Sequence, residues 1–395
     1  MIDYFKKKLE TILDSIVDPM ISKIVALSWN IRIIILIFAV AISSAIAYPE
    51  AALRGATTAK SFVRIWLQSS KDVTLSAKTT ARLHSSRQVL WATLNSMLDN
   101  THDPQLTPWV AAQIASARSE PSSSFKAELD SYFQSTKILD CSCWRELPHT
   151  ERSPRLIHVS GWVLSAKAQT ELVAPDDEIA FLLDKQTEAG WWPMYVIASV
   201  SDANASTYAT SWALLGLQAQ FHLMEGNTNM QARMEGAIAK GSAWLIRTRA
   251  EPARWKDYPL SEVGRVSESI SGLVLHALNT VNVSIAGDLS RQWLGSLPAS
   301  APLPDAVEQS GILTETADGP QTDYYLQFRL PWLIIGTVDA YQYGSTAEKV
   351  AAASWLDKAI LQEGVRKMER EPLPWKRAEL LVALRYLEAR LSSQH

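Results

Sequence analysis

Residues 181–192 read FLLDKQTEAGWW, and residues 244–255 read WLIRTRAEPARW. Each segment starts with an aromatic residue followed by leucine, and each ends on a tryptophan. The first residues, Phe181 and Trp244, are 63 positions apart (244 − 181), and the final tryptophans, Trp192 and Trp255, are also 63 apart (255 − 192). Agreement of register at both ends indicates an internal repeat of a helical unit.

Two interleaved series extend this repeat along the chain. The aromatic–leucine pair recurs at Trp293-Leu294 and Trp355-Leu356, and Phe133 marks an earlier copy. Between these pairs, a small residue or proline opens an apolar helix at Gly161-Trp162, Ser211-Trp212, Ser271-Gly272 and Pro331-Trp332. Apolar residues at helical spacing dominate throughout, with no series of alternating strands. The sequence therefore predicts an all-α domain built from outer and inner helices, with 380–387 as a fifth inner helix and 89–98, following a helix at 62–67, as a sixth.

The first unit resembles the QW-type repeat of the terpene cyclase and protein prenyltransferase superfamily. Its aromatic-Leu-x3-Gln-x3-Gly-x-Trp order is met by Phe181-Leu182, Gln186, Gly190 and Trp192. The second unit is degenerate, with Arg249 in place of Gln and Ala253 in place of Gly. The resemblance covers 181–255 as motif and roughly 120–390 as architecture. It implies an α/α toroid of five to six helix pairs over residues 121–393, in which Gln186 and Trp192 are structural.

The catalytic motifs of that superfamily are missing. Class II terpene cyclases carry Asp-x-Asp-Asp, whereas Asp176-Asp177 lacks the leading Asp and suits the start of a helix. The prenyltransferase branch holds zinc on Asp, Cys and His, but here Cys141 and Cys143 end an outer helix and His276 stands alone on an inner one. We expect no metal and no cofactor, with His276 as a hydrogen-bonded core residue. A disulfide across the single residue between the cysteines is expected to be strained, so the redox compartment stays open.

The remaining candidates lie near the starts of inner helices, at the expected mouth of the toroid. Glu268 and Asp323 form a candidate acid pair for catalysis. The alternative is that either carboxylate pairs with Arg265 or Arg329. The candidate ligand-binding residues are Tyr208, Trp212, Tyr324, Arg329 and Trp332.

The N-terminal region predicts a membrane attachment. Residues 33–49 carry no charge, which favours a single transmembrane helix over 31–49, while Ala45-Ile46-Ala47 leaves a cleaved signal peptide as the alternative. Residues 1–30 form an amphipathic leader, whose positions 2–27 suit the membrane surface or a partner membrane protein. Residues 50–120 are connecting helices or a first toroid pair. The distribution of basic residues favours placing the globular domain outside the cytoplasm.

Composition limits the function classes. The 395 residues include 38 Lys+Arg and 41 Asp+Glu, a net charge of −3, and 47% are hydrophobic. This excludes nucleic acid as the main partner and argues against disorder. We expect a membrane-anchored, non-catalytic module that binds a lipid or isoprenoid or serves as a scaffold. The alternatives are an enzyme acting on an isoprenoid, lipid or glycan through cavity carboxylates, and a structural subunit of a membrane complex.

Overall fold

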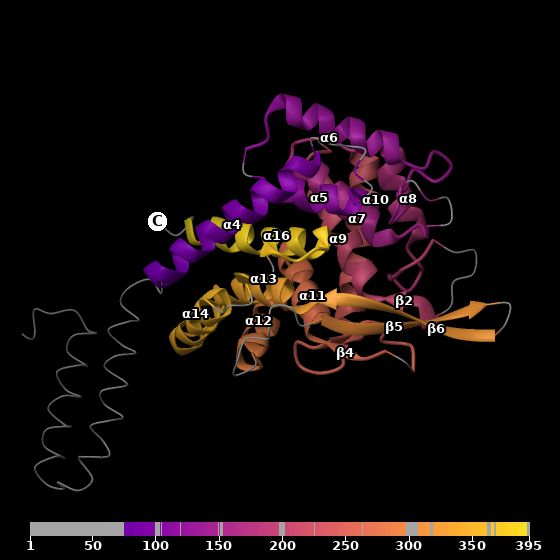
Figure 1. Cartoon of the computed structure of the whole chain (residues 1–395). Coiled ribbons are helices and arrows are strands. Elements are labelled where there is room, and N and C mark those ends of the chain that lie inside the picture. Colours follow the sequence, from indigo (N-terminus) through magenta and orange to yellow (C-terminus); the bar gives the residue numbers. More distant parts are fainter. Residues whose placement is uncertain are drawn as a thin grey trace, which may run out of the picture. The chain divides into compact units, whose positions relative to one another are not determined.

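The computed structural model describes residues 75–98, 103, 105–118, 120–148, 150, 153–196, 202–224, 226–262, 264–297, 307–316, 319–361, 365–366 and 369–392 (Figure 1). These residues are mostly helical, so the all-α prediction is confirmed. Within this part of the chain, none of the helices is long and apolar enough to cross a membrane. The predicted leader 1–30 and the predicted transmembrane segment 31–49 lie outside the described residues.

Six helices are buried on nearly all sides. They are α5 (Pro108–Ser116), α7 (Ile157–Gln169), α9 (Thr207–Phe221), α11 (Glu268–Thr280), α13 (Arg329–Tyr341) and the middle of α16 (Pro374–Ser392). In α7, for example, every residue from 157 to 167 is buried. Such helices need neighbours all round, because an apolar surface left facing water is costly.

The buried helices contact one another in a closed order. α5 packs against α7, α7 against α9, α9 against α11, α11 against α13, α13 against α16, and α16 returns to α5. The chain thus brings its first and last buried helices together, although about 265 positions separate their starts (374 − 108 = 266).

Six further helices alternate with these along the chain. They are α4 (Ala77–Leu98), α6 (Ser123–Thr136), α8 (Asp176–Lys185), α10 (Thr228–Arg247), α12 (Ala286–Gly295) and α14 (Thr346–Leu361). Each of these six helices contacts one or more of the buried helices. For example, α10 packs against α9, and α12 packs against α13. The prediction of 89–98 as a buried inner helix is wrong. These residues belong to α4, which buries only a stripe including Leu83, Leu90 and Leu94, whereas the next helix, α5, is buried on nearly all sides.

Glycines allow two pairs of buried helices to approach closely. A Cβ on Gly161 of α7 would lie 2.4 Å from the carbonyl oxygen of Trp212 on α9. A Cβ on Gly272 of α11 would lie 2.3 Å from the carbonyl oxygen of Trp332 on α13. The same close contact therefore recurs in two pairs of neighbouring helices. The facing residues Trp212 and Trp332 are aligned in the sequence repeat, whereas Gly161 and Gly272 are one position out of that alignment.

The aromatic–leucine units share one hydrogen-bonding geometry. The indole Nε1 of Trp192 donates to Leu182 O at 2.7 Å, and that of Trp255 donates to Leu245 O at 2.6 Å. Two residues before each tryptophan the backbone is left-handed, with φ of 101° at Gly190 and 51° at Ala253. A Cβ makes the left-handed conformation unfavourable for Ala253, whereas Gly190 has no Cβ. Glycine is therefore the usual residue at such a position.

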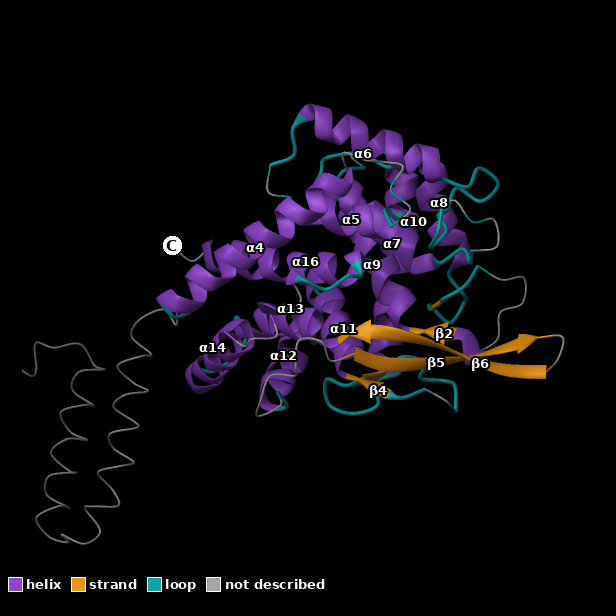
Figure 2. Cartoon of the chain, in the orientation of Figure 1, coloured by secondary structure: helices purple, strands orange, loops and turns teal. Residues whose placement is uncertain are grey.

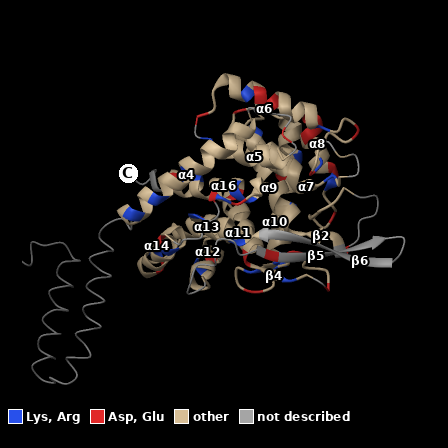
Figure 3. Cartoon of the chain, in the orientation of Figure 1, with Lys and Arg blue, Asp and Glu red and all other residues tan. Residues whose placement is uncertain are grey.

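Gln186 also has the predicted structural role. Its Nε2 donates to Gly190 O at 2.9 Å and to Ala237 O of α10 at 2.8 Å, which connects the end of α8 to α10. Asp176 and Asp177 lie in the first turn of α8, where carboxylates favour the helix dipole (Figure 3). The N-cap position itself is occupied by Pro175, whose side chain forms no capping hydrogen bond.

The expectation that the chain lacks strands is wrong for residues 307–328. Strands β5 (Val307–Thr316) and β6 (Gly319–Phe328) pair antiparallel from Val307↔Phe328 to Thr316↔Gly319, drawn as orange arrows in Figure 2. The dipeptide Asp318-Gly319 between two runs containing Ile, Thr and Tyr is a hairpin signal that the helical periodicity concealed. Two-residue ladders also link β1 (Trp192–Pro193) to β2 (Ala205–Ser206) and β3 (Trp255–Lys256) to β4 (Val266–Ser267), and a short 3-10 helix η1 (Asp202–Asn204) precedes β2.

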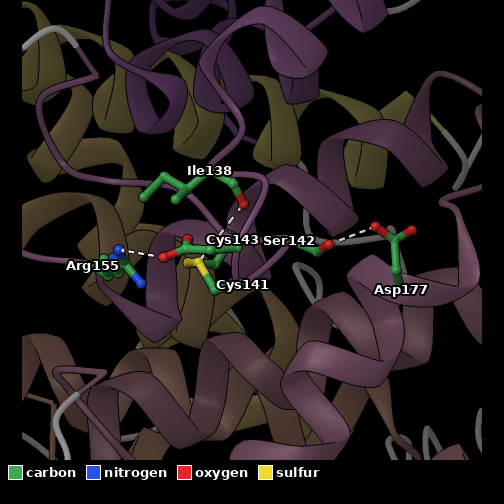
Figure 4. Close-up of a disulfide and its surroundings, with 7 residues drawn as sticks. Ile138, Cys141, Ser142, Cys143, Arg155 and Asp177 are labelled. Carbon is green, nitrogen blue, oxygen red and sulfur yellow. Dashed lines mark hydrogen bonds and ion pairs between the residues drawn. A yellow bond between two sulfur atoms is a disulfide. The ribbon is translucent and has the colours of Figure 1, made fainter.

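Cys141 and Cys143 form a disulfide just after α6 (Figure 4). Their Cα atoms are 5.2 Å apart, inside the usual range for a disulfide. The intervening Ser142 has a left-handed backbone, with φ of 52°, and its hydroxyl donates to Asp177 Oδ2 at 2.5 Å. This local turn makes the short bridge possible.

Candidate functional site

Four rings from four buried helices form an aromatic arc. Each ring belongs to the second residue of its helix: Trp375 of α16, Trp109 of α5, His158 of α7 and Tyr208 of α9. The centroids of successive rings are 5.7, 5.6 and 5.0 Å apart in that order. Trp109 and Trp375 are half-buried, whereas His158 and Tyr208 are buried. We call these four residues the rim.

One helical turn further on, the same four helices carry Gln113, Trp162, Trp212 and Glu379. Residues four apart lie on one face of a helix, one above the other, so this second set lies below the rim. The rings of Trp162 and Trp212 stack with centroids 3.6 Å apart. Trp332 of α13 joins them, 5.4 Å from Trp212 and 6.2 Å from Trp162. All three indoles are at most 3% exposed. We call this set, with Trp332, the centre.

The centre, together with His158 of the rim, contains buried polar groups without hydrogen-bond partners among the described residues. Both side-chain polar atoms of Gln113 are unpaired, as are Glu379 Oε2, His158 Nδ1 and the indole nitrogens of Trp162 and Trp212. A buried polar group left unpaired costs about 1–3 kcal/mol. Buried polar groups left unpaired occur at catalytic sites, at strained sites and where water binds, so this cluster is a candidate functional site.

Burial shifts the two titratable groups towards their neutral forms. It raises the pKa of Glu379 to about 8, although a hydrogen bond from Trp332 acts in the opposite direction. It lowers the pKa of His158 to about 3. At pH 7 the carboxyl is therefore mostly protonated and the imidazole neutral. The site presents uncharged donors and acceptors among aromatic rings.

The structure brings together only part of the predicted site. Trp212 and Trp332 meet in the centre, and Tyr208 lies on the rim above Trp212. Asp323 and Tyr324 lie on β6, where their backbones pair with Ile312 and Gly311. The side chains of Asp323 and Tyr324 lie outside the described part, so their predicted roles stay predictions.

Glu268 and Arg329 form an ion pair, which was the predicted alternative to an acid pair of Glu268 with Asp323. Arg254 approaches the same carboxylate at 3.8 Å. Glu268 is thus neutralised by two guanidinium groups, which favours a structural role over an acid pair with Asp323.

Glu308 of β5 was not predicted. Its carboxylate accepts from the backbone N–H groups of Glu268 at 2.9 Å and Ser269 at 3.1 Å, and it lies 3.3 Å from Arg329 Nε. The hairpin therefore caps the N-terminus of α11 with a negative charge.

Four site residues, Trp109, Gln113, His158 and Glu379, were also missed. The spacing of four between members of each pair, Trp109 with Gln113 and Trp375 with Glu379, was visible in the sequence. Their convergence depends on contacts between α5 and α16, which no local pattern reveals.

His276 has the predicted core hydrogen bond, with Nδ1 2.7 Å from Asp339 Oδ2. Among the described residues, no group of three His, Cys, Asp or Glu side chains is placed to hold a metal ion. In comparisons with known proteins, no family model matches this chain and no curated protein is detectably related to it.

Proposed function

We propose that residues 75–392 form an α/α toroid of six helix pairs and that this toroid is a non-catalytic binding module for a lipid or isoprenoid. The closed order of contacts from α5 to α16 and back supports a ring of six inner helices. Alternation of buried and one-sided helices along the chain supports the pairing.

The aromatic rim is the observation that carries the binding proposal. Four rings from four inner helices meet at one level, and two of them, Trp109 and Trp375, keep exposed surface. Stacked indoles offer a large apolar area to a ligand at little entropic cost. The stacked tryptophans of the centre close the space below, so an apolar chain lies against the rim rather than through the ring.

The membrane attachment is part of the same proposal. Residues 31–49 anchor the chain, and residues 2–27 contact the membrane surface or a partner helix. The disulfide between Cys141 and Cys143 supports a domain outside the cytoplasm, because disulfides persist in oxidising compartments.

Titration of the full-length protein in detergent with farnesol, followed by tryptophan fluorescence, tests the binding proposal. Trp375→Ala removes one rim ring, and Leu373→Ala, an exposed neighbour, is the matched control. We expect saturable binding by the wild type and Leu373→Ala and a loss of roughly tenfold or more in Trp375→Ala. Equal affinity in all three proteins, or no saturable change, contradicts the proposal.

A second candidate function is acid catalysis, favoured by Glu379. A buried carboxyl that keeps its proton near pH 7 is available as a proton donor, although its raised pKa makes it a weaker acid. The surrounding indoles can stabilise a cation formed when the proton is transferred to an isoprenoid double bond and the carboxylate is left behind. Incubation of the protein with isoprenoid substrates in D2O tests this. Deuterium incorporation by the wild type and none by Glu379→Gln supports catalysis, and no incorporation by either protein contradicts it.

A further inference from the structure

A groove lies away from the rim and the centre, where α4 and α16 meet the segment after α5. Its volume is about 280 Å³. It is lined by Arg87, Gln88 and Trp91 of α4, by Arg118 and Glu120 after α5, and by Leu381 of α16. The volume suits a small molecule or a head group rather than a long apolar chain.

Arg118 is held in the groove by aromatic rings. Its guanidinium carbon lies 4.0 Å from the centroid of Phe125 and 5.6 Å from that of Trp91. In the part of the chain that the structure describes, no carboxylate forms an ion pair with it. A guanidinium that contacts aromatic rings and forms no ion pair with a carboxylate has N–H groups available for an anion.

Arg87 adds a second, incompletely paired guanidinium. Its Nη1 lies 3.1 Å from Glu388, but its Nε is buried and has no hydrogen-bond partner among the described residues. Glu388 is shared with Arg385 at 3.0 Å, so one carboxylate faces two cations. Glu120 is the one carboxylate among the lining residues beside Arg87 and Arg118, so the lining of the groove carries a net positive charge.

We propose that this groove binds a phosphate group, an inference independent of the proposed function of the rim. The tetrahedral oxygens of one phosphate can accept from guanidinium groups on two different elements, whereas a planar carboxylate is satisfied by one bidentate Arg. Trp91 and Leu381 supply an apolar wall for the group that the phosphate carries. The phosphate belongs either to a small molecule or to a membrane lipid.

Isothermal titration of the full-length protein in a non-ionic detergent tests this proposal. The probes are inorganic phosphate and dihexanoyl phosphatidic acid, with dihexanoyl glycerol as the probe that lacks phosphate. Arg118→Gln removes the stacked charge. Gln88→Glu adds a negative charge at an exposed edge of the groove, so it tests the site even if Arg118→Gln does not fold. Arg233→Gln, an exposed Arg of α10, is the matched control.

We expect a phosphate probe to bind the wild type and Arg233→Gln and to bind both groove variants roughly tenfold or more weakly. Binding of phosphatidic acid alone assigns the groove to a lipid head group, and comparable binding of inorganic phosphate assigns it to a small phosphorylated molecule. Unchanged affinity in Arg118→Gln and Gln88→Glu overturns the proposal. So does the absence of binding by either phosphate probe, or equal binding of dihexanoyl glycerol.

Discussion

The Cα of Gly161 on α7 faces the carbonyl group of Trp212 on α9, so that a Cβ at this position would lie 2.4 Å from the oxygen. This close approach brings the rings of Trp162 and Trp212 into a stack with centroids 3.6 Å apart. The stacking of Trp162 on Trp212 in the centre thus depends on glycine, which has no side chain, at position 161 of α7.

Gly161→Ala is expected to destabilise the fold by about 1–3 kcal/mol, because a backbone atom must move to admit the methyl group. Gly236→Ala on α10 is the control, since nothing lies within 4 Å of its added Cβ. That change is expected to stabilise the helix by about 0.5–1 kcal/mol. Urea unfolding measures both, and equal effects of the two substitutions would refute the close contact.

We expect the free energy of unfolding to fall as the pH rises, because of Glu379. Its folded pKa of about 8 lies above the ordinary value of 4.5, so between these values the folded state holds a proton that the unfolded state has released. Stability therefore falls as the pH rises through this range. Between pH 6.5 and 8 the loss is roughly 2 kcal/mol. Glu379→Gln is expected to abolish this slope in urea unfolding, and a slope that persists in the variant would contradict the assignment.

We expect His158 to lower the free energy of unfolding as the pH falls below 6.5. Its pKa is about 3 when folded against 6.5 ordinarily, so the unfolded state gains a proton first and stability falls as the pH drops below 6.5. Between pH 4.5 and 6.5 the slopes of His158 and Glu379 oppose each other, which gives a plateau. In His158→Gln the plateau becomes a rise in stability towards low pH. An unaltered profile would show that His158 is not neutral and buried in solution.

The repeat units in residues 181–255 could be predicted from the sequence because the interactions that stabilise them are local. The indole of Trp192 and the amide of Gln186 bond to carbonyl groups within one unit or the next, and these needs leave a fixed spacing in the sequence. The centre was predicted only through Trp212 and Trp332. Glu379 and Trp109 were missed because their proximity to the centre follows from contacts between helices far apart in the chain.

The hairpin at 307–328 was missed for a different reason. Its sequence has strand and turn residues, but it interrupts a long series of helical units whose periodicity dominated the interpretation. The consequence reached the site, because Glu308 of this hairpin reaches the N-terminus of α11.

Gln186→Ala is expected to cost about 1–3 kcal/mol, since two carbonyl groups lose their common donor. Gln186→Glu is expected to cost more, because a carboxylate would face the same two oxygens. Arg249→Ala, at the equivalent position of the next unit, should change stability by no more than about 0.5 kcal/mol. Thermal unfolding of the three variants decides, and an equal effect at positions 186 and 249 would count against a specific role for the amide.

Glu308→Ala is expected to expose the first turn of α11, because the N–H groups of Glu268 and Ser269 lose their acceptor. Hydrogen exchange measured by mass spectrometry should show faster exchange in a peptide covering 267–272. Asp288→Ala, which removes an exposed carboxylate of α12, serves as the control and should leave that peptide unchanged. Protection that survives Glu308→Ala would mean that another group caps the helix.

Binding of a lipid or isoprenoid at the rim is tested most directly by mass spectrometry of the molecules that the full-length protein retains. The protein is purified in mild detergent as wild type, Trp375→Ala and Leu373→Ala. We predict that a lipid or isoprenoid copurifies with the wild type and Leu373→Ala and is lost from Trp375→Ala. Copurification of no such molecule, or its equal retention by all three proteins, would contradict binding at the rim.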